Sequence, residues 1–195
     1  MKRLIIILIL TLSFQSWTKA NDIEEFEIEG MSIGDSLLNF ITKKSIITEI
    51  ENKGTSVYYD NDYVSILLSE MKNKLLIYND VKAVIKQNDQ SYKIYALEGL
   101  LAFENIDECH KNQLEISDEI KGSLNLKVEG DIWNLKKKRL PETIKDIKYI
   151  DFDLNEDLSE GSFRTGCYDY KDGPDILMVI INSPEFDKYL LKSSR

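Results

Sequence analysis

The sequence predicts an α+β protein in which helices pack on one face of a mainly antiparallel sheet. Two features of the chain indicate this class. Short apolar or alternating stretches follow one another and are separated by turns rich in Asn and Asp, which is the pattern of strands joined in hairpins. Amphipathic segments with helix-start residues precede, divide and follow these strands. Strands joined by tight turns run antiparallel, and helices outside such a sheet cover one of its faces.

The first twenty residues have the three parts of a secretory signal peptide. Lys2 and Arg3 supply the positive start, an apolar run extends from Leu4 to Leu12, and Thr18 and Ala20 occupy the positions that a signal peptidase reads. The run is shorter than the roughly 20 apolar residues that span a bilayer. We therefore expect cleavage after Ala20 and a periplasmic or secreted protein, with an uncleaved anchor as the alternative.

The mature chain is expected to contain 175 of the 195 residues and to be strongly acidic. Loss of residues 1–20 removes three of the 25 basic residues and none of the 34 acidic ones, which changes the net charge from −9 to −12. This length predicts one domain, residues 21–195, with two packed halves, 21–104 and 105–195, as the alternative. An acidic surface repels phosphates, so nucleic acid is not expected as a partner. The basic cluster Lys136–Arg139 is interpreted as a solvated loop, and a patch for anionic lipid or a partner is the alternative.

The first half contains one expected helix and several strands. Residues 22–29 alternate around two apolar positions and predict a short strand. A helix is expected over 32–43, because Ser32 and Asp35 have the S-x-x-D spacing of a capping box and the apolar residues after them recur every three to four positions. The strands that follow are expected at 57–68, as a hairpin with its turn at 60–62, and at 75–86 and 92–103, joined by a turn at 87–90.

The second half repeats this order of a helix followed by strands. A helix is expected over 106–121 and ends at Gly122, whereas residues 123–142 are polar and mixed and receive no assignment. Strands are expected at 147–154, 162–170 and 175–181, and a last helix starts at Ser183-Pro184, where proline suits the first helical position. The two units would begin at Ser32 and Ile106, although the residues themselves show no repeat.

Cys109 and Cys167 are the two cysteines of the chain, and they are expected to form a disulfide. Paired cysteines in an exported protein are more often oxidised than metal-binding or reactive. Cys109 falls on the apolar side of the helix at 106–121 and Cys167 falls in the strand at 162–170, so the bond would join a helix to the sheet. Closing a loop of this length contributes about 4 kcal/mol in the chain-entropy model. Two cysteines and one histidine do not complete a four-ligand zinc site, and no cofactor or metal is expected.

Two short motifs resemble those of serine hydrolases. Residues 30–34, GMSIG, match the G-x-S-x-G of a nucleophile elbow, and residues 34–37, GDSL, match the motif that names the GDSL esterases. An esterase of GDSL type would use Ser36 as nucleophile and His110, the end of a D-x-x-H, as general base. That family has a parallel α/β fold with the serine after a buried strand, whereas here a helix is expected to start at Ser32 and hairpin strands follow. We therefore interpret the motifs as a helix start, with the esterase as an alternative.

Residues 151–162, DFDLNEDLSEGS, partly match the calcium loop of an EF-hand. The first, third, fifth and seventh positions fit, but Glu156 stands where the loop needs Gly and Ser162 stands where it needs a bidentate Glu. Binding of a small ligand or Ca²⁺ at residues 151–160 is therefore a second alternative. The tyrosines suit either a partner-binding face or ordinary strand packing, and packing is the default interpretation.

Four stretches resemble a family of small uncharacterised exported proteins from AT-rich marine bacteria: FEIEGMSIGDSLLNFI, YKIYALEGLLAFEN, ECHKNQLEI and CYDY. This resemblance implies export and no particular activity. The G-M-S-x-x-x-S-L-L segment before antiparallel strands also looks like the small lipoproteins of the outer-membrane β-barrel assembly machine and like β-lactamase-inhibitor-type domains, which are non-catalytic binding modules. We therefore expect a non-enzymatic periplasmic protein that binds another periplasmic or envelope protein, in an assembly or inhibitor role.

Overall fold

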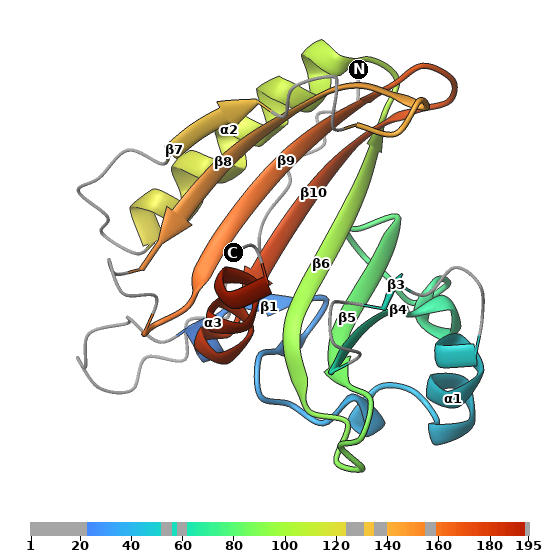
Figure 1. The fold of residues 1–195 in the computed structure, drawn as a ribbon. Helices are drawn as coiled ribbons and strands as arrows, with labels where there is room; N and C mark the ends of the chain where they lie inside the picture. The colour runs from blue at the N-terminus through green and yellow to red at the C-terminus, as the bar shows by residue number, and fades with distance from the viewer. Residues whose placement is uncertain are drawn as a thin grey trace.

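Eight strands form one antiparallel sheet in the computed structural model of the chain, which describes residues 23–51, 56–57, 62–123, 131–134, 140–154 and 159–193 (Figure 1). The strands of this sheet are β3 (Ser56–Val57), β4 (Tyr63–Leu67), β5 (Asp80–Lys86), β6 (Ile94–Phe103), β7 (Asp131–Asn134), β8 (Ile144–Asp153), β9 (Ser162–Tyr170) and β10 (Asp175–Asn182). The α-helices are α1 (Lys43–Glu51), α2 (Ile106–Ser123) and α3 (Pro184–Ser193). A small hairpin of β1 (Glu27–Ile28) and β2 (Met31–Ser32) precedes them.

The two halves of the chain each contribute four neighbouring strands to the sheet, whose order is β3-β4-β5-β6-β10-β9-β8-β7. A helix precedes the four strands in each half, α1 in the first and α2 in the second. The last strands of the two halves, β6 and β10, pair antiparallel at the centre, from Phe103 opposite Asp175 to Ala96 opposite Asn182. The α+β class and the repeated order of helix and strands are therefore confirmed, and both halves share one continuous sheet.

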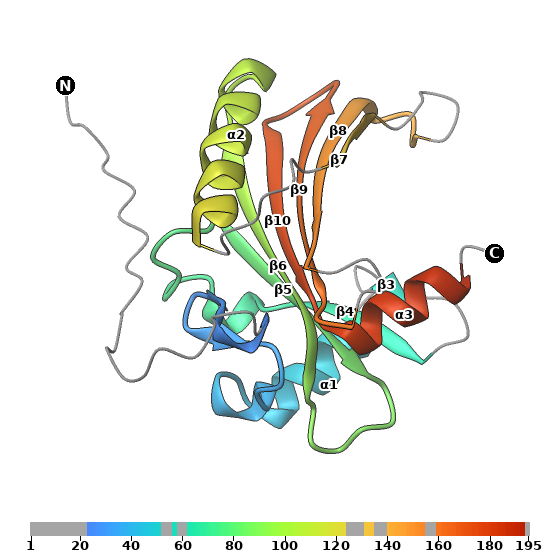
Figure 2. The same ribbon diagram turned by 90° about the vertical axis from the view of Figure 1, so that its left-hand side faces the viewer.

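One face of the sheet carries most of the buried core. Leu177 and Val179 of β10 pack against Cys109 of α2 on this face. Farther along the same face, Ile46 of α1 joins a larger apolar cluster with residues of β4, β5 and β6. Figure 2 shows α1 and α2 on the same side of the strands. Because successive strand residues point to opposite faces, the alternate residues of these strands lie on the other side.

The last helix, α3, lies on the opposite face from α1 and α2 (Figure 2). The helix follows β10 directly, and its apolar residues Phe186 and Leu190 pack on Tyr63 and Tyr95 at one end of the sheet. Lys86 of β5 also bonds Glu185 of α3. The expectation that helices cover a single face therefore holds for α1 and α2 and does not extend to α3.

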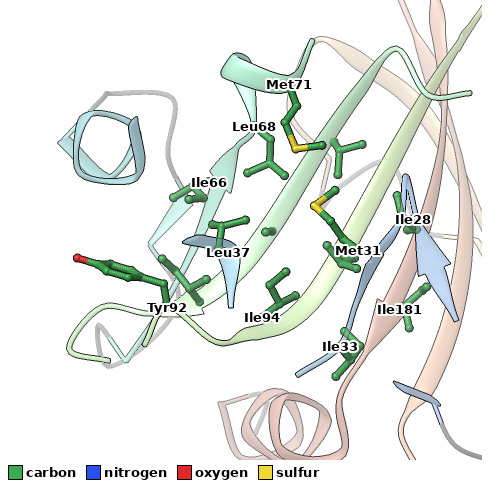
Figure 3. Packing of buried hydrophobic residues seen from close by; sticks show 14 of the residues in the cluster. Ile28, Met31, Ile33, Leu37, Ile66, Leu68, Met71, Tyr92, Ile94 and Ile181 are labelled. Carbon is green, nitrogen blue, oxygen red and sulfur yellow. The ribbon is translucent and has the colours of Figure 1, made fainter. Parts of the chain in front are cut away.

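The segment before α1 packs apolar side chains against the strands of the sheet (Figure 3). Met31 and Leu37 come from this segment and are completely buried. They meet side chains of β4, β6 and β10 in a cluster whose labelled members are Ile28, Met31, Ile33, Leu37, Ile66, Leu68, Met71, Tyr92, Ile94 and Ile181. The segment before α1 is thus a component of the core.

The helix expected over 32–43 does not form, and this prediction was wrong. Gly34 has a positive φ of 95°, which no residue of a right-handed helix has. The backbone instead pairs with the start of β6, since Gly34 N donates to Ile94 O at 3.0 Å and Leu37 N donates to Tyr92 O at 2.9 Å. A short 3-10 turn at Leu37–Asn39 follows, and α1 begins only at Lys43. Asp35 does bond the amide of Ser32, at 3.0 Å, as the partner residue of a capping box would.

Several other boundaries differ from the expected ones. Residues 22–29 contain a 3-10 turn at Ile23–Glu25 and only two strand residues, and the strand expected from residue 75 begins at Asp80. The unassigned residues 123–142 contain β7 at the edge of the sheet. The strands at β9 and β10 and the helices α2 and α3 are confirmed to within a residue or two.

The expected disulfide is confirmed, and it joins α2 to β9. Cys109 and Cys167 are bonded, with their Cα atoms 5.9 Å apart, and both are completely buried. One turn farther along α2, Gln113 is also buried, and its Nε2 donates to the carbonyl oxygens of Lys148 at 2.9 Å and Thr165 at 3.1 Å. The helix is therefore held on the sheet by the disulfide and by the two hydrogen bonds of Gln113. The buried Gln113 was not expected from its residue type.

Candidate protein-binding face

Strand β10 is apolar on both of its sides, but a described helix lies along only one of them. Residues 176–181 read ILMVII without a polar residue. A strand of this kind is usually buried on both faces of its sheet. Leu177 and Val179 are buried under α2, whereas Met178 and Ile180 on the other face are only half-buried. Of the helices that the structure describes, α3 alone lies on that face, and it packs at the end of the sheet on Tyr63 and Tyr95.

The apolar side chains on this second side adjoin one another over the centre of the sheet, where β6, β9 and β10 lie toward the viewer in Figure 1. Pairing places Ile176 between Tyr168 and Ala102, and places Met178 between Gly166 and Leu100. We call this patch the open sheet face, and its members are Leu100, Ala102, Tyr168, Tyr170, Ile176, Met178 and Ile180. The face is therefore built from β6, β9 and β10, the strands where the two halves of the chain meet.

A cluster of tyrosines lies at the β8–β9 side of the open sheet face. The rings of Tyr149 and Tyr168 meet edge to face with centroids 5.9 Å apart, and their hydroxyls are 2.9 Å apart. The ring of Tyr170 stacks on that of Tyr168, with the ring centroids 6.4 Å apart. Burial, more than any charge nearby, raises the pKa of Tyr168, so its hydroxyl stays neutral. The hydroxyl of Tyr168 also lies 3.9 Å from the sulfur of Met178, which joins the cluster to the rest of the face.

Gly166 makes room for this cluster. A β-carbon at this position would lie 2.8 Å from the ring of Tyr149 and 3.2 Å from that of Tyr168. Since real β-carbons are essentially never found within 3.0 Å of other atoms, the position of the Tyr149 ring depends on the absence of a side chain at Gly166. Sequence reasoning had no local signal for this role, because Tyr149 and Gly166 are brought together only by the pairing of β8 with β9.

Charged residues at the edge of the open sheet face are paired with one another. Arg164 donates to both oxygens of Asp151, at 2.6 and 2.9 Å, and its guanidinium lies 5.3 Å from the ring centre of Tyr149. Lys82 lies 3.9 Å from Glu98 between β5 and β6. The centre of the face is thus apolar and aromatic, and its edge is polar. An exposed apolar patch with a polar edge is typical of a protein-binding surface.

Ser36 and His110, the residues of the esterase alternative, lie at opposite ends of the long central strand β6. Ser36 bridges to Lys93 just before β6, and its hydroxyl donates to the carbonyl of Ser91 at 2.6 Å. His110 follows Cys109, which is bonded to Cys167 of β9. Cys167 pairs with a residue of β10 that in turn pairs with Leu101, near the other end of β6. The eight residue steps from Lys93 to Leu101 span about 26 Å of extended strand. The structure therefore does not bring the two together.

His110 sits at the surface of α2 in a partly buried position. Burial is the main reason that the pKa of His110 lies below its usual value, and the nearby charge of Lys148 lowers it further. Asp107 and Asp146 oppose this shift. His110 is therefore a partly buried helix residue next to the disulfide of Cys109.

In the calcium alternative at residues 151–160, the expected first ligand is already bonded to an arginine. Asp151 is held by Arg164 within the sheet, and Asp153 ends β8 at the surface. Among residues that the structure describes, no three His, Cys, Asp or Glu side chains are grouped so that they could hold a metal ion. Residues 155–158 of this segment lie outside the described part of the chain.

Two further expectations fall on residues that the structure does not describe. The signal peptide at 1–20 and the basic cluster Lys136–Arg139 both lie outside the described ranges. Within those ranges, no helix combines the length and the apolar character that a membrane span needs.

The open sheet face itself was missed in the sequence, although a signal for it was present. The run of apolar residues at 176–181 predicts a strand that needs cover on both sides, but it does not say which side stays open. Comparison with models of protein families, with curated proteins and with solved structures finds no match for this chain.

Proposed function

We propose that the chain is an exported, non-enzymatic protein that binds another periplasmic or envelope protein through the open sheet face. The observation that carries this proposal is the apolar, aromatic centre of the sheet that no described helix covers. Burying such a surface is favourable by about 25 cal/mol for each Å² of apolar area. A protein partner of ordinary size covers about 800 Å² on each side.

The residue types of the face support a protein partner rather than a small molecule. Tyrosine and methionine are enriched in protein interfaces, and Tyr168, Tyr170 and Met178 lie together here. The sheet presents them on a broad strand surface, which suits a second macromolecule. The expected net charge of −12 for the mature chain would draw a partner with a basic edge toward it and would disfavour nucleic acid.

The place of action is proposed from the signal peptide and the disulfide together. Disulfides persist in oxidising compartments such as the periplasm and are rare in the cytosol. The bond between Cys109 and Cys167 is therefore compatible with the export that the first twenty residues predict. Envelope assembly and inhibition of another envelope protein are two roles that would each use such a binding face.

The test is crosslinking in living cells with matched surface variants. Met178→Asp places a charge in the centre of the open sheet face, and Leu114→Asp places the same charge on α2, where Leu114 is 48% exposed on the other side of the sheet. We expect a stoichiometric crosslinked complex with wild type and with Leu114→Asp, and none with Met178→Asp. A wild-type chain that stays alone after crosslinking, or a complex that survives Met178→Asp in a folded variant, would overturn the proposal.

A further inference from the structure

The loop that joins the Ser69–Met71 turn to β5 carries the most exposed large apolar side chain among the described residues. Leu76 is 91% exposed and its neighbour Ile77 is 40% exposed. We call residues 72–79 the apolar loop. It lies on the same side of the sheet as α2, beside the β1–β2 hairpin (Figure 2). It is therefore a different surface from the open sheet face.

A single carboxylate binds three consecutive amides at the tip of the apolar loop. Glu29 accepts hydrogen bonds from the amides of three consecutive residues: Leu76 at 2.8 Å, Ile77 at 2.7 Å and Tyr78 at 2.9 Å. Glu29 sits in the turn between β1 and β2 with a positive φ of 55°. Side chains with a β-carbon seldom adopt this conformation, so the turn has some strain that these three bonds offset.

The base of the apolar loop is anchored as firmly as its tip. Tyr78 lies over Gly99 of β6, so closely that a β-carbon on Gly99 would be 2.4 Å from the ring. Burial is the main cause that raises the pKa of Tyr78 to about 12, followed by the charges of Glu29 and Glu119. Asn79 continues the contact with β6, since its side-chain oxygen accepts a bond from Ala102 N at 2.7 Å.

Six consecutive amides of the apolar loop are satisfied within the protein. Lys74 and Leu75 donate to the carbonyl of Met71 at 2.7 and 3.2 Å, and Asn79 donates to Leu100 O at 2.9 Å. The three amides between them are bonded to Glu29, as described above. A backbone whose amides need no water can enter an apolar phase without the cost of unpaired N–H groups. The loop thus presents its aliphatic tip without needing to rearrange.

We propose that the apolar loop inserts Leu76 and Ile77 into the interfacial layer of a lipid bilayer. Two aliphatic side chains at the tip of a rigid loop suit shallow insertion, whereas protein interfaces depend on larger surfaces with Tyr, Trp and Arg anchors. Lys72 and the exposed Lys74 precede the tip in the apolar loop, and Lys72 is 3.5 Å from Asp80. An exposed lysine such as Lys74 can extend its ammonium group to a lipid phosphate while its stem stays near the apolar layer.

The acidic net charge of the protein determines how strongly this contact forms and which lipid suits it. With a net charge of −12 expected for the mature chain, long-range attraction to anionic lipid is weak and the aliphatic tip must supply the binding. Attachment is therefore shallow and reversible, and phosphatidylcholine vesicles are the suitable probe. This inference does not depend on the open sheet face, since it uses another side of the molecule.

The test is partitioning of the folded mature chain onto phosphatidylcholine vesicles, measured by sedimentation. Leu76→Ser should lower the partition coefficient by about tenfold, because it removes the larger of the inserted contacts. Leu114→Ser, which removes an exposed leucine from α2, should leave it unchanged. In Leu76→Trp, lipids brominated on their acyl chains should quench the fluorescence of the introduced indole.

Each outcome decides the proposal. The proposal is overturned if the wild-type chain does not sediment with the vesicles, or if the Leu76→Ser variant sediments as well as wild type. The apolar loop would then be expected to bind an apolar pocket on a protein instead. Glu29→Gln adds a second check, since it replaces one acceptor oxygen with a donor and loosens the loop while keeping Leu76. It should weaken partitioning, and it should leave crosslinking through the open sheet face intact.

Discussion

The hydroxyl of Ser162 donates a hydrogen bond of 3.0 Å to the carboxylate of Asp187, in the contact between α3 and the sheet. Asp187 is only 5% exposed, and its second oxygen is buried with no hydrogen-bond partner among the described residues. Burial therefore raises the pKa of Asp187 to about 6, and the bond from Ser162 offsets part of that effect. A neutral Asp187 suits this site better than a charged one.

This buried carboxyl predicts that the protein gains stability on mild acidification. In the unfolded chain Asp187 ionises near its ordinary value of 3.8, and in the folded chain it ionises only near 6. The unfolded state therefore loses its proton first, so the free energy of unfolding should fall as pH rises from about 4 to about 7, by about 1–3 kcal/mol. Urea unfolding at a series of pH values measures this effect.

Asp187→Asn provides the matched comparison for the same measurement. The amide keeps an acceptor for Ser162 and cannot ionise, so the variant should match wild type near pH 4 and exceed it at pH 8. Other groups that titrate in this range contribute equally to both proteins. Parallel stability curves for the two proteins would show that Asp187 carries no pH-dependent cost.

Gly166→Ala should disturb the tyrosine cluster of the open sheet face. The new methyl group would stand 2.8 Å from the ring of Tyr149, so the ring must move, at a cost of about 1–3 kcal/mol in the free energy of unfolding. The near-ultraviolet circular dichroism of the tyrosines should change as well. Gly122→Ala is the control, since a β-carbon there meets nothing within 4 Å and a helical alanine stabilises by up to about 1 kcal/mol. Equal melting temperatures for the two variants would contradict the role of Gly166.

Loss of the disulfide should destabilise the fold without releasing α2 completely. Replacing Cys109 and Cys167 by alanine should lower the free energy of unfolding by about 2–5 kcal/mol, because the unfolded chain is no longer constrained over the 58-residue loop. The hydrogen bonds of Gln113 to the sheet stay in place. Calorimetry with and without a reductant measures the change in wild type. The prediction is wrong if the melting temperature of wild type is the same in both conditions.

A fluorophosphonate probe should not label the protein. Ser36 donates to the carbonyl of Ser91, and about 26 Å of strand β6 separates its position from the region of His110. Intact mass before and after treatment measures the adduct, and the untreated mass also tests cleavage after Ala20. A stoichiometric adduct that disappears in Ser36→Ala would make the protein a serine hydrolase.

Much of the fold could be predicted from local patterns. Strand β9 and helices α2 and α3 follow from periodicity and helix-start residues, which act within a few positions of the chain. The disulfide could be predicted because Cys109 and Cys167 have no other cysteine to pair with. The helix predicted at 32–43 was wrong for the opposite reason. Its spacing is helical, but Gly34 and Leu37 bond to Ile94 and Tyr92, which are distant in the chain.

Local patterns in the sequence specify most of the later strands and helices and the antiparallel pairing of strands joined by tight turns, since both depend on short-range spacing. What these elements cover depends on the tertiary structure. The pairing of β6 with β10 joins the halves, leaves Met178 and Ile180 half-buried while Leu177 lies under α2, and allows α3 to bury Asp187. These outcomes depend on contacts between residues far apart in the chain, and no local pattern specifies which of two apolar faces is covered.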